Sequence, residues 1–210
     1  MTADRGFFVA IDGPSGIGKT TVVSQLRQLL ADQGYPVFAT GEPTRTLIGN
    51  LARYGTDDHR GLALACLVAA DRYEHLDHEI RPALRAGKIV LSDRYLASTL
   101  VLQRLDEVPS DFLWLLNQYA DRPDLYIILS GDITRARQRA VQRGLYSRFH
   151  RGGREAGIAE AALYESVADD LAQRGFKVVV HDTTGEASGD VAEAIAAMIL
   201  REWPPQVDEA

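Results

Sequence analysis

Cysteine is almost absent from the chain: among 210 residues only Cys66 is present. A single thiol excludes an intrachain disulfide and a metal site built from several cysteines. Cys66 lies in the apolar run LALACLVAA, so we expect a buried thiol without a chemical role. The five histidines are scattered without the spacing of metal ligands, and we assign no metal to them.

Basic residues are fewer than acidic ones, 23 against 29, and no apolar run reaches the length of a membrane span. The formal net charge of -6 argues against a broad nucleic-acid surface, whereas a local group of arginines could still bind a small anion. The first residues, MTADRGFF, do not form a basic leader with a long apolar segment behind it. We therefore expect a soluble cytoplasmic protein with no nucleic-acid polymer and no membrane as partner.

Residues 13–20 carry the most informative motif of the chain, GPSGIGKT, which fits the pattern of a phosphate-binding loop. An apolar strand-like run, residues 7–11, precedes it and an apolar pattern of helical spacing follows it, as this kind of loop requires. Its glycines allow backbone N–H groups to face a polyphosphate. The expected ATP-binding residues are Gly13, Ser15, Gly16, Ile17, Gly18, Lys19, Thr20 and Thr21.

Strand-like and helix-like segments alternate along the chain without a repeat or a linker. The expected strands are residues 7–11, 35–40, 88–91, 122–131 and 176–183. This alternation predicts one domain, residues 1–210, with the α/β fold of a P-loop NTPase: a five-stranded parallel sheet in a three-layer α/β/α arrangement. A long helix should open at Asp57 and Asp58 and end at Gly87. Its middle is apolar on all sides, which predicts burial in the domain or at a subunit contact.

Charged residues follow two of the expected strands directly. Glu42 and Arg45 follow the second strand, and Asp93 and Arg94 follow the third. Ligands of open parallel sheets bind beyond the carboxyl ends of the strands, so these side chains should lie beside the phosphate loop. Asp93 and Thr20 could hold Mg²⁺, and Arg94 could clamp a phosphoryl group; the alternative for Asp93 is a helix cap. Arg45 could instead be a solvated side chain.

Arg72 stands out because it follows the apolar part of the long helix. Both a buried ion pair and a substrate-reading arginine are consistent with that setting. Ser98, Thr99 and Gln103, on the helix after the third strand, could border the same crevice. The residues expected to bind the acceptor substrate are Asp12, Glu42, Arg45, Val68, Arg72, Arg94, Ser98, Thr99 and Gln103.

Residues 143–156 combine several arginines with glycines and have almost no apolar residue to anchor them. We expect an arginine-bearing lid, in which Arg148 could neutralise charge on a transferring phosphoryl group as the segment closes. A solvated basic loop is the alternative.

The motifs GPSGIGKTT, Glu42-Pro43, AADR, SDRY and RPDL, taken in this order, resemble those of the thymidylate kinase family. The resemblance covers nearly the whole chain. It implies that Lys19 holds the phosphates of ATP, that Asp93 and Arg94 organise Mg²⁺ and the acceptor phosphate, that Arg72 addresses the base, and that Arg148 is the lid arginine. It also implies a homodimer.

Three positions depart from the family pattern. The aromatic residue usual four positions before the base-reading arginine is Val68 here, the one before Gln103 is Leu102, and the arginine usual before Glu-Pro is Gly41. A lost aromatic face costs about 1 to 3 kcal/mol per stacked base. These departures therefore leave open an acceptor that is bulkier than dTMP or carries a base other than thymine.

The sequence thus predicts an enzyme that transfers the γ-phosphoryl group of Mg-ATP to a nucleoside monophosphate, dTMP or a related pyrimidine deoxynucleotide. The expected catalytic residues are Lys19, Asp93, Arg94 and Arg148. One alternative is a deoxynucleoside or other hydroxyl kinase of the same fold, with Glu42 as general base. A second is a regulator that only binds or hydrolyses ATP.

Overall fold

The computed structural model describes residues 5–142, 147–151 and 153–203, and its centre is a five-stranded sheet. The strands are β1 Phe7–Asp12, β2 Val37–Gly41, β3 Ile89–Asp93, β4 Leu125–Ser130 and β5 Val178–Asp182. They are all parallel, in the order β2-β3-β1-β4-β5. All five strands and the parallel α/β fold predicted from the sequence are confirmed.

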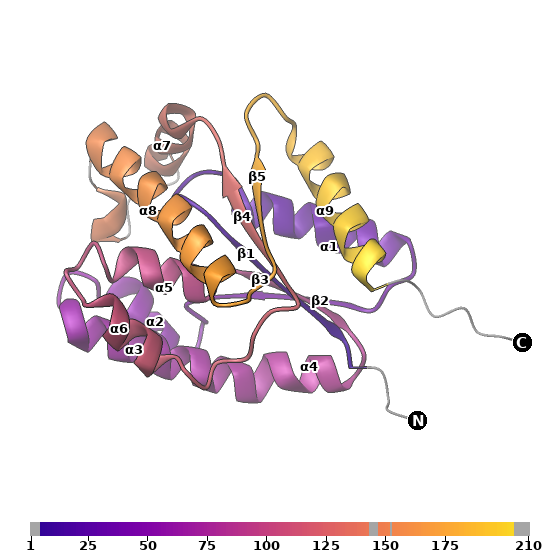
Figure 1. Cartoon of the computed structure of the whole chain (residues 1–210), viewed down its shortest axis with the longest axis horizontal. Helices are drawn as coiled ribbons and strands as arrows, with labels where there is room; N and C mark the ends of the chain where they lie inside the picture. Colours follow the sequence, from indigo (N-terminus) through magenta and orange to yellow (C-terminus); the bar gives the residue numbers. More distant parts are fainter. Residues whose placement is uncertain (1–4, 143–146, 152, 204–210) are drawn as a thin grey trace, which may run out of the picture.

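Helices cover both faces of the sheet (Figure 1). Their bounds are α1 Lys19–Asp32, α2 Leu47–Tyr54, α3 Gly61–His75, α4 Arg81–Arg85, α5 Leu96–Leu102, α6 Ser110–Leu116, α7 Ile133–Gln142, α8 Arg154–Gln173 and α9 Ser188–Glu202. A π-helical turn, η1 Leu76–Ile80, joins α3 to α4, and a short 3₁₀ helix, η2 Arg148–His150, precedes α8. Among the described residues no helix combines the length and apolarity needed to cross a bilayer.

The two faces of the sheet form separate hydrophobic cores because successive side chains of a strand point to opposite sides. Val9 and Ile11 of β1 pack with α1 and α9, whereas Phe8 and Ala10 pack with α5, α8 and the helices around η1. Every residue of β1 is buried. The central strand is therefore fixed from both sides, and it carries the phosphate loop at its carboxyl end.

The long helix predicted from Asp57 to Gly87 was partly wrong. The backbone forms a turn at Asp57 and Asp58, α3 begins only at Gly61, and the helix changes to π geometry at Leu76. Helix α2, which the sequence analysis did not predict, precedes this turn and begins at Thr46, whose side-chain oxygen accepts a hydrogen bond from Gly49 N. Helix α2 packs against α3.

Cys66 corrects a second expectation, because its side chain is exposed rather than buried. Only one side of α3 is buried, and Leu62, with 55% of its surface accessible, lies on the open side. A helix that is apolar all round can have one side against the domain and another on the surface, and the sequence alone does not say which.

Candidate functional site

The phosphate loop connects β1 to the first residue of α1. Gly13, Gly16 and Gly18 have φ values of 142°, 82° and 117°, a region that side chains rarely adopt. A Cβ on Gly16 would lie 1.9 Å from the carbonyl oxygen of Ala136. At this position glycine is required both for conformation and for space, which accounts for the motif.

Lys19 is the first residue of α1 and is 5% exposed. Its Nζ donates hydrogen bonds to the carbonyl oxygens of Gly13 (2.7 Å) and Pro14 (2.9 Å), so the ammonium group lies over the loop. Burial, followed by repulsion from Arg94, lowers the pKa of Lys19 to about 7. A bound polyphosphate would counter both effects and favour the charged form.

Thr20 and Asp93 meet at the edge of the same loop. Thr20 Oγ1 donates to Asp93 Oδ2 over 2.5 Å, while the buried Asp93 Oδ1 has no hydrogen-bond partner among the described residues. A hydroxyl beside an unsatisfied carboxylate oxygen is a fitting donor set for Mg²⁺, which uses few protein oxygens and takes its other ligands from phosphates and water. No group of three or more His, Cys, Asp or Glu side chains suited to a metal occurs within the described ranges.

Arg94 follows β3 and has φ 75°, a left-handed conformation that costs a non-glycine residue energy. Two hydrogen bonds hold it there, from Arg94 N to Ile11 O (2.9 Å) and from Ser92 Oγ to Arg94 O (2.7 Å). The guanidinium Nη1 donates to Ser98 Oγ over 2.9 Å. Strained backbone that is held by its surroundings is typical of functional sites.

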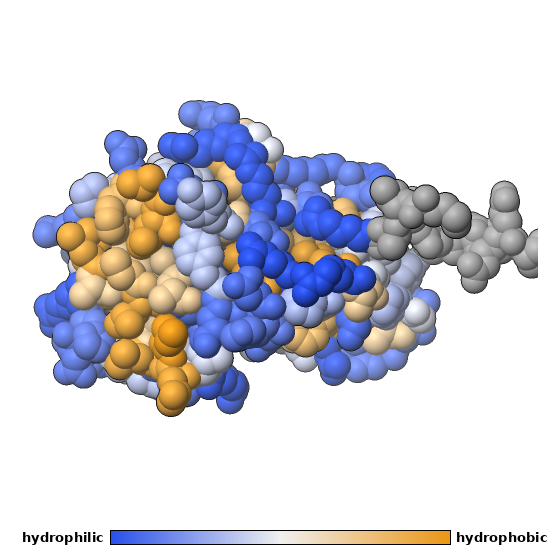
Figure 2. All heavy atoms as spheres, turned by 90° about the horizontal axis from the view of Figure 1, so that it is seen from below, coloured by the Kyte–Doolittle hydropathy of each residue, from blue (hydrophilic) through white to orange (hydrophobic). Residues whose placement is uncertain are grey.

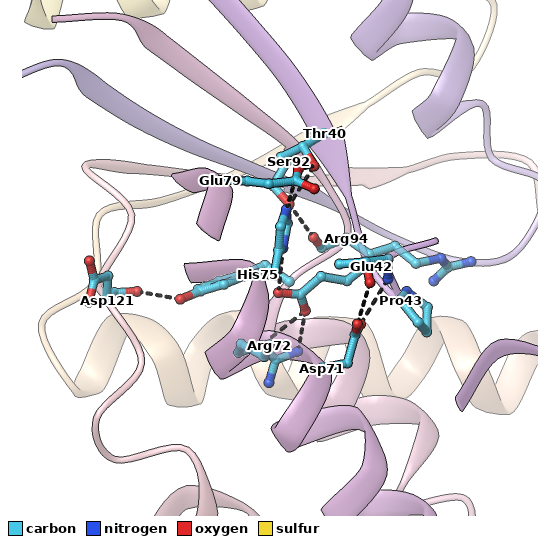
Figure 3. A network of polar contacts seen from close by, with 12 residues as sticks. Thr40, Glu42, Pro43, Asp71, Arg72, His75, Glu79, Ser92, Arg94 and Asp121 are labelled. Atoms are coloured by element: carbon cyan, nitrogen blue, oxygen red, sulfur yellow. Dashed lines mark hydrogen bonds and ion pairs between the residues drawn. The ribbon is translucent and has the colours of Figure 1, made fainter. Parts of the chain in front are cut away.

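Glu42, after β2, lies in a buried network between α3 and the sheet (Figure 3). Its Oε2 accepts hydrogen bonds from Arg72 Nη2 (2.6 Å) and Nε (3.0 Å), and its Oε1 lies 3.3 Å from His75 Nδ1. Burial alone would raise the pKa of Glu42, but the Arg72 charge and His75 outweigh it and hold the pKa below its usual value. Glu42 is therefore an ionised partner of Arg72.

Arg72 is 1% exposed, and its remaining contacts also lie within the protein. It donates to Asn117 Oδ1 (2.7 Å) and Thr99 Oγ1 (2.8 Å), and its guanidinium carbon lies 5.0 Å from the centre of the Tyr95 ring. Of the two interpretations open in the sequence, the structure shows the buried ion pair. Arg72 could still contact a base in addition to forming this ion pair, because it also lines a cavity.

Two cavities meet at Arg94. The larger, of about 1060 Å³, extends from the phosphate loop to β2 and is here called the phosphate-loop cavity. The smaller, of about 70 Å³, lies between α2, α3 and α5 and is called the inner cavity. The residues that line both are Glu42, Pro43, Arg53 and Arg94.

The residues predicted for the acceptor divide between these cavities. Arg45 lines the phosphate-loop cavity, and the inner cavity is lined by Val68, Arg72, Ser98, Thr99 and Gln103, with Glu42 and Arg94 at both. Asp12 lines neither: it is fully buried and accepts hydrogen bonds from Tyr95 N (2.9 Å) and Tyr126 Oη (2.7 Å). The Ile17 side chain is likewise buried in the core beside α1, so a ligand of the loop would meet this residue through its backbone.

Arg148, the predicted lid arginine, is held away from the phosphate loop by its own contacts. Its N and Nε donate to Thr56 Oγ1 (3.2 Å) and Thr56 O (2.5 Å), and its Nη2 forms an ion pair with Asp106. Of the predicted lid, residues 143–146 and 152 lie outside the described residues.

The sequence analysis missed Glu160, on α8. This residue is 3% exposed, and its Oε1 accepts hydrogen bonds from Ser15 N (3.1 Å) and Ser15 Oγ (2.9 Å) in the phosphate loop. No local pattern could reveal a contact between residues so far apart in the sequence.

Arg53, a cation that lines both cavities, was missed as well, because α2 was not predicted. A third hollow, of about 540 Å³, lies on the other side of the phosphate loop between α7 and the segment after β5. Its lining includes Arg139, Thr184 and Ser188, none of which carries a motif in the sequence.

Comparison with known proteins agrees with this geometry. The family model "Thymidylate kinase" matches residues 11–152. A relative named "Probable thymidylate kinase" from Thermococcus gammatolerans is 32% identical over 207 residues, which are 90% of this chain and 100% of the relative. The protein of the same name from Pyrobaculum aerophilum is 36% identical over 204 residues, 91% of this chain and 97% of the relative. The one from Pyrococcus abyssi is 39% identical over 153 residues, 69% and 75% of the two chains. The chain therefore belongs to the thymidylate kinase family.

Proposed function

We propose that this protein transfers the γ-phosphoryl group of ATP to the phosphate of dTMP, giving thymidine diphosphate and ADP, and that the whole chain is one kinase domain. Membership of the family supports a nucleotide kinase, and the names of the relatives point to thymidylate as the acceptor. The observation that carries the proposal is the junction at Arg94, where the cavity of the phosphate loop meets a second, smaller cavity. Such an arrangement suits a reaction between two bound phosphates.

On the donor side, the backbone N–H groups of the phosphate loop would bind the phosphates of ATP, and Lys19 would neutralise their charge. Thr20 and Asp93 would hold Mg²⁺, which would supply positive charge beside the phosphates of ATP. Alignment and charge neutralisation supply most of the acceleration in such reactions, so no strong base is needed.

On the acceptor side, Arg94 would hold the phosphate of dTMP, with Arg45 as a further cation in the same cavity. The base would occupy the inner cavity beside Thr99 and Gln103. Arg148 stays our proposed lid arginine, and in this role its guanidinium would have to leave Asp106 for the transferring phosphoryl group.

The alternative of a hydroxyl kinase with Glu42 as general base is disfavoured by the network around this carboxylate. A base must take up a proton, but Glu42 is bound twice by Arg72 and its pKa is lowered. The alternative of an ATP-binding regulator does not account for the inner cavity and its polar lining.

We further propose a cytoplasmic homodimer whose contact is the exposed apolar face of α2, α3 and α6. Leu47 on α2 (91% exposed), Leu62 on α3 (55%) and Leu115 on α6 (61%) are among the large apolar side chains that these helices expose. Figure 2 shows hydrophobic residues gathered over the same part of the molecule. A contiguous apolar surface of this kind favours contact with another protein, and in this family we expect a second copy of the chain.

The decisive experiment measures ADP formation from ATP and Mg²⁺ with dTMP, dUMP, dCMP and thymidine as acceptors. We expect turnover with dTMP and none with thymidine. Turnover of thymidine without turnover of dTMP would show a hydroxyl kinase, and ATP hydrolysis that no acceptor stimulates would show the regulator.

A further inference from the structure

The inner cavity has aliphatic walls where relatives of the chain are expected to have aromatic ones. Val68 from α3 and Leu102 from α5 both line it. An aliphatic side chain gives a base an apolar contact but no π face on which to stack. If dTMP is the acceptor, as proposed above, its base lacks both of these stacking partners.

An aromatic ring nevertheless reaches this cavity from a distant part of the chain. Phe149, in η2, lines the inner cavity together with Val68 and Leu102. Its side chain is half-buried, and the neighbouring Ser147 is 5% exposed and lines the same cavity. The sequence analysis did not identify Phe149, because nothing in its local pattern links it to α3 or α5.

The segment that carries Phe149 is fixed to the turn before α3. Arg148 binds Thr56 through its backbone N and its Nε and pairs with Asp106, whose Oδ2 also accepts a hydrogen bond from Gly61 N at 2.7 Å. On the other side of Phe149, Arg151 Nη1 donates to Asp57 Oδ1 over 3.0 Å. The guanidinium carbon of Arg148 lies 4.3 Å from the centre of the Phe149 ring. The bonds from Arg148 N to Thr56 and from Arg151 to Asp57 do not involve the Arg148 guanidinium, so they would keep this segment beside the cavity even when that guanidinium leaves Asp106.

The same cavity contains a buried polar atom without a hydrogen-bond partner among the described residues, Oε1 of Gln103. Gln103 as a whole is 3% exposed. Leaving a buried amide oxygen unpaired is costly, and a base with an N–H group at its edge would satisfy it. Arg53 Nε, in the same lining, is also buried without a hydrogen-bond partner among the described residues. An apolar wall with a small number of polar groups is the usual form of a site that binds a small organic ligand.

We propose that Phe149 supplies the aromatic wall of the base site, in place of the aromatic residues absent at positions 68 and 102. The free volume of about 70 Å³ is smaller than the ~150 Å³ of a cavity that holds benzene, so part of the lining has to give way when a base enters. In our proposal the half-buried ring of Phe149 is the part that moves outward. The displaced ring then lies against the face of the base. Phe149 is thus a specificity-determining residue that acts by stacking and takes no part in the phosphoryl transfer.

The test compares the wild type with Phe149→Ala and Phe149→Leu, using equilibrium binding of dTMP and of 2-deoxyribose 5-phosphate, which has no base. We expect both variants to weaken dTMP binding about ten-fold and to leave the sugar phosphate unaffected, since only the stack on the base is lost. In steady-state kinetics the KM for dTMP should rise and kcat should change little. Phe149→Leu keeps the apolar volume and provides a folded variant should Phe149→Ala be unstable.

A second aromatic position provides an independent check. Val68→Phe added to Phe149→Ala should restore dTMP binding, whereas Val68→Phe alone should weaken it because two rings then compete for one small cavity. Unchanged or tighter dTMP binding by Phe149→Ala, or equal loss for both ligands, would overturn the inference. Absence of dTMP turnover in the wild type would instead overturn the proposed function, so the two failures are distinguishable.

Discussion

The carboxylate of Glu42 and the guanidinium of Arg72 form a buried ion pair, with Nη2 2.6 Å from Oε2, that joins the end of β2 to α3. Both side chains are almost completely inaccessible, at 3% and 1%. Both residues line the inner cavity, so the pair joins two of its walls to each other. The ion pair therefore helps to shape the acceptor site and also stabilises the fold.

Glu42→Gln should be among the most destabilising polar substitutions in this protein. It leaves the Arg72 charge buried and uncompensated, which costs about 3 kcal/mol or more. Chemical denaturation measures the loss, and the KM for dTMP should rise because the cavity walls shift. Glu79→Gln is the matched control: its side chain is 41% exposed and touches only the outer end of the network, through Thr40 and His75. Equal loss in both variants would contradict this account.

Arg94→Ala should lower kcat about 100-fold or more, because the group that spans the two cavities is removed. Arg94→Gly removes the same side chain but suits the φ of 75°. We expect the two variants to be equally inactive, with the glycine variant more stable by about 1 kcal/mol in urea unfolding. An alanine variant as stable as the glycine variant would show that the left-handed backbone is not strained.

Binding of Mg-ATP should take up a proton at Lys19. With a pKa of about 7 the free enzyme holds this group largely neutral at pH 8, whereas bound phosphate would raise the pKa and restore the charge. Affinity for ATP should accordingly fall as the pH rises above 7, at most about ten-fold per unit. Calorimetry in buffers of different ionisation enthalpy counts the protons. Lys19→Arg, which stays charged, should bind ATP without this uptake, since any proton change of the nucleotide is common to both proteins.

Gly16→Ala should abolish ATP binding and destabilise the fold, because the new Cβ would collide with the carbonyl oxygen of Ala136. Gly18→Ala is the comparison: Gly18 also has positive φ, but its Cβ would meet nothing within 4 Å. We expect the second variant to lose about 1 kcal/mol of stability from backbone strain alone. Binding of a fluorescent ATP analogue and thermal unfolding separate the two effects.

Leu62→Asp should convert the proposed homodimer to a monomer. A charge in the middle of an apolar contact loses its hydration without gaining a partner. Sedimentation velocity reports the change. Val141→Asp, on α7 and outside this face, is the control, since Val141 is 56% exposed against 55% for Leu62. A dimer that persists in Leu62→Asp would place the contact elsewhere.

Much of the donor side could be predicted from the sequence because the relevant signals are local. The apolar run before Asp12, the glycines of the loop and the helical pattern after Lys19 occupy one short stretch, and hydrogen bonds within that stretch determine its conformation. The positions of Glu42, Asp93 and Arg94 could also be predicted from the sequence, because parallel strands bring their carboxyl ends to the same edge of the sheet. Gly41 and Asp93 are indeed opposite each other in the sheet.

The acceptor side could be predicted only in part. Helix α2 has a capping threonine and an amphipathic pattern, and these signals were available but overlooked. The exposure of Cys66 could not be predicted, because the sequence of an apolar helix does not indicate which of its sides the domain covers.

By itself, the sequence determined five parallel strands, a phosphate loop at the end of the central one, and a set of charged residues at the neighbouring strand ends. These features depend on periodicity and on short motifs. Only the tertiary structure decided that Glu160 supports Ser15, that Arg72 is neutralised by Glu42, and that Phe149 lines the same cavity as Val68. Each of these contacts joins distant segments, and which segments meet depends on how the helices pack on the two faces of the sheet.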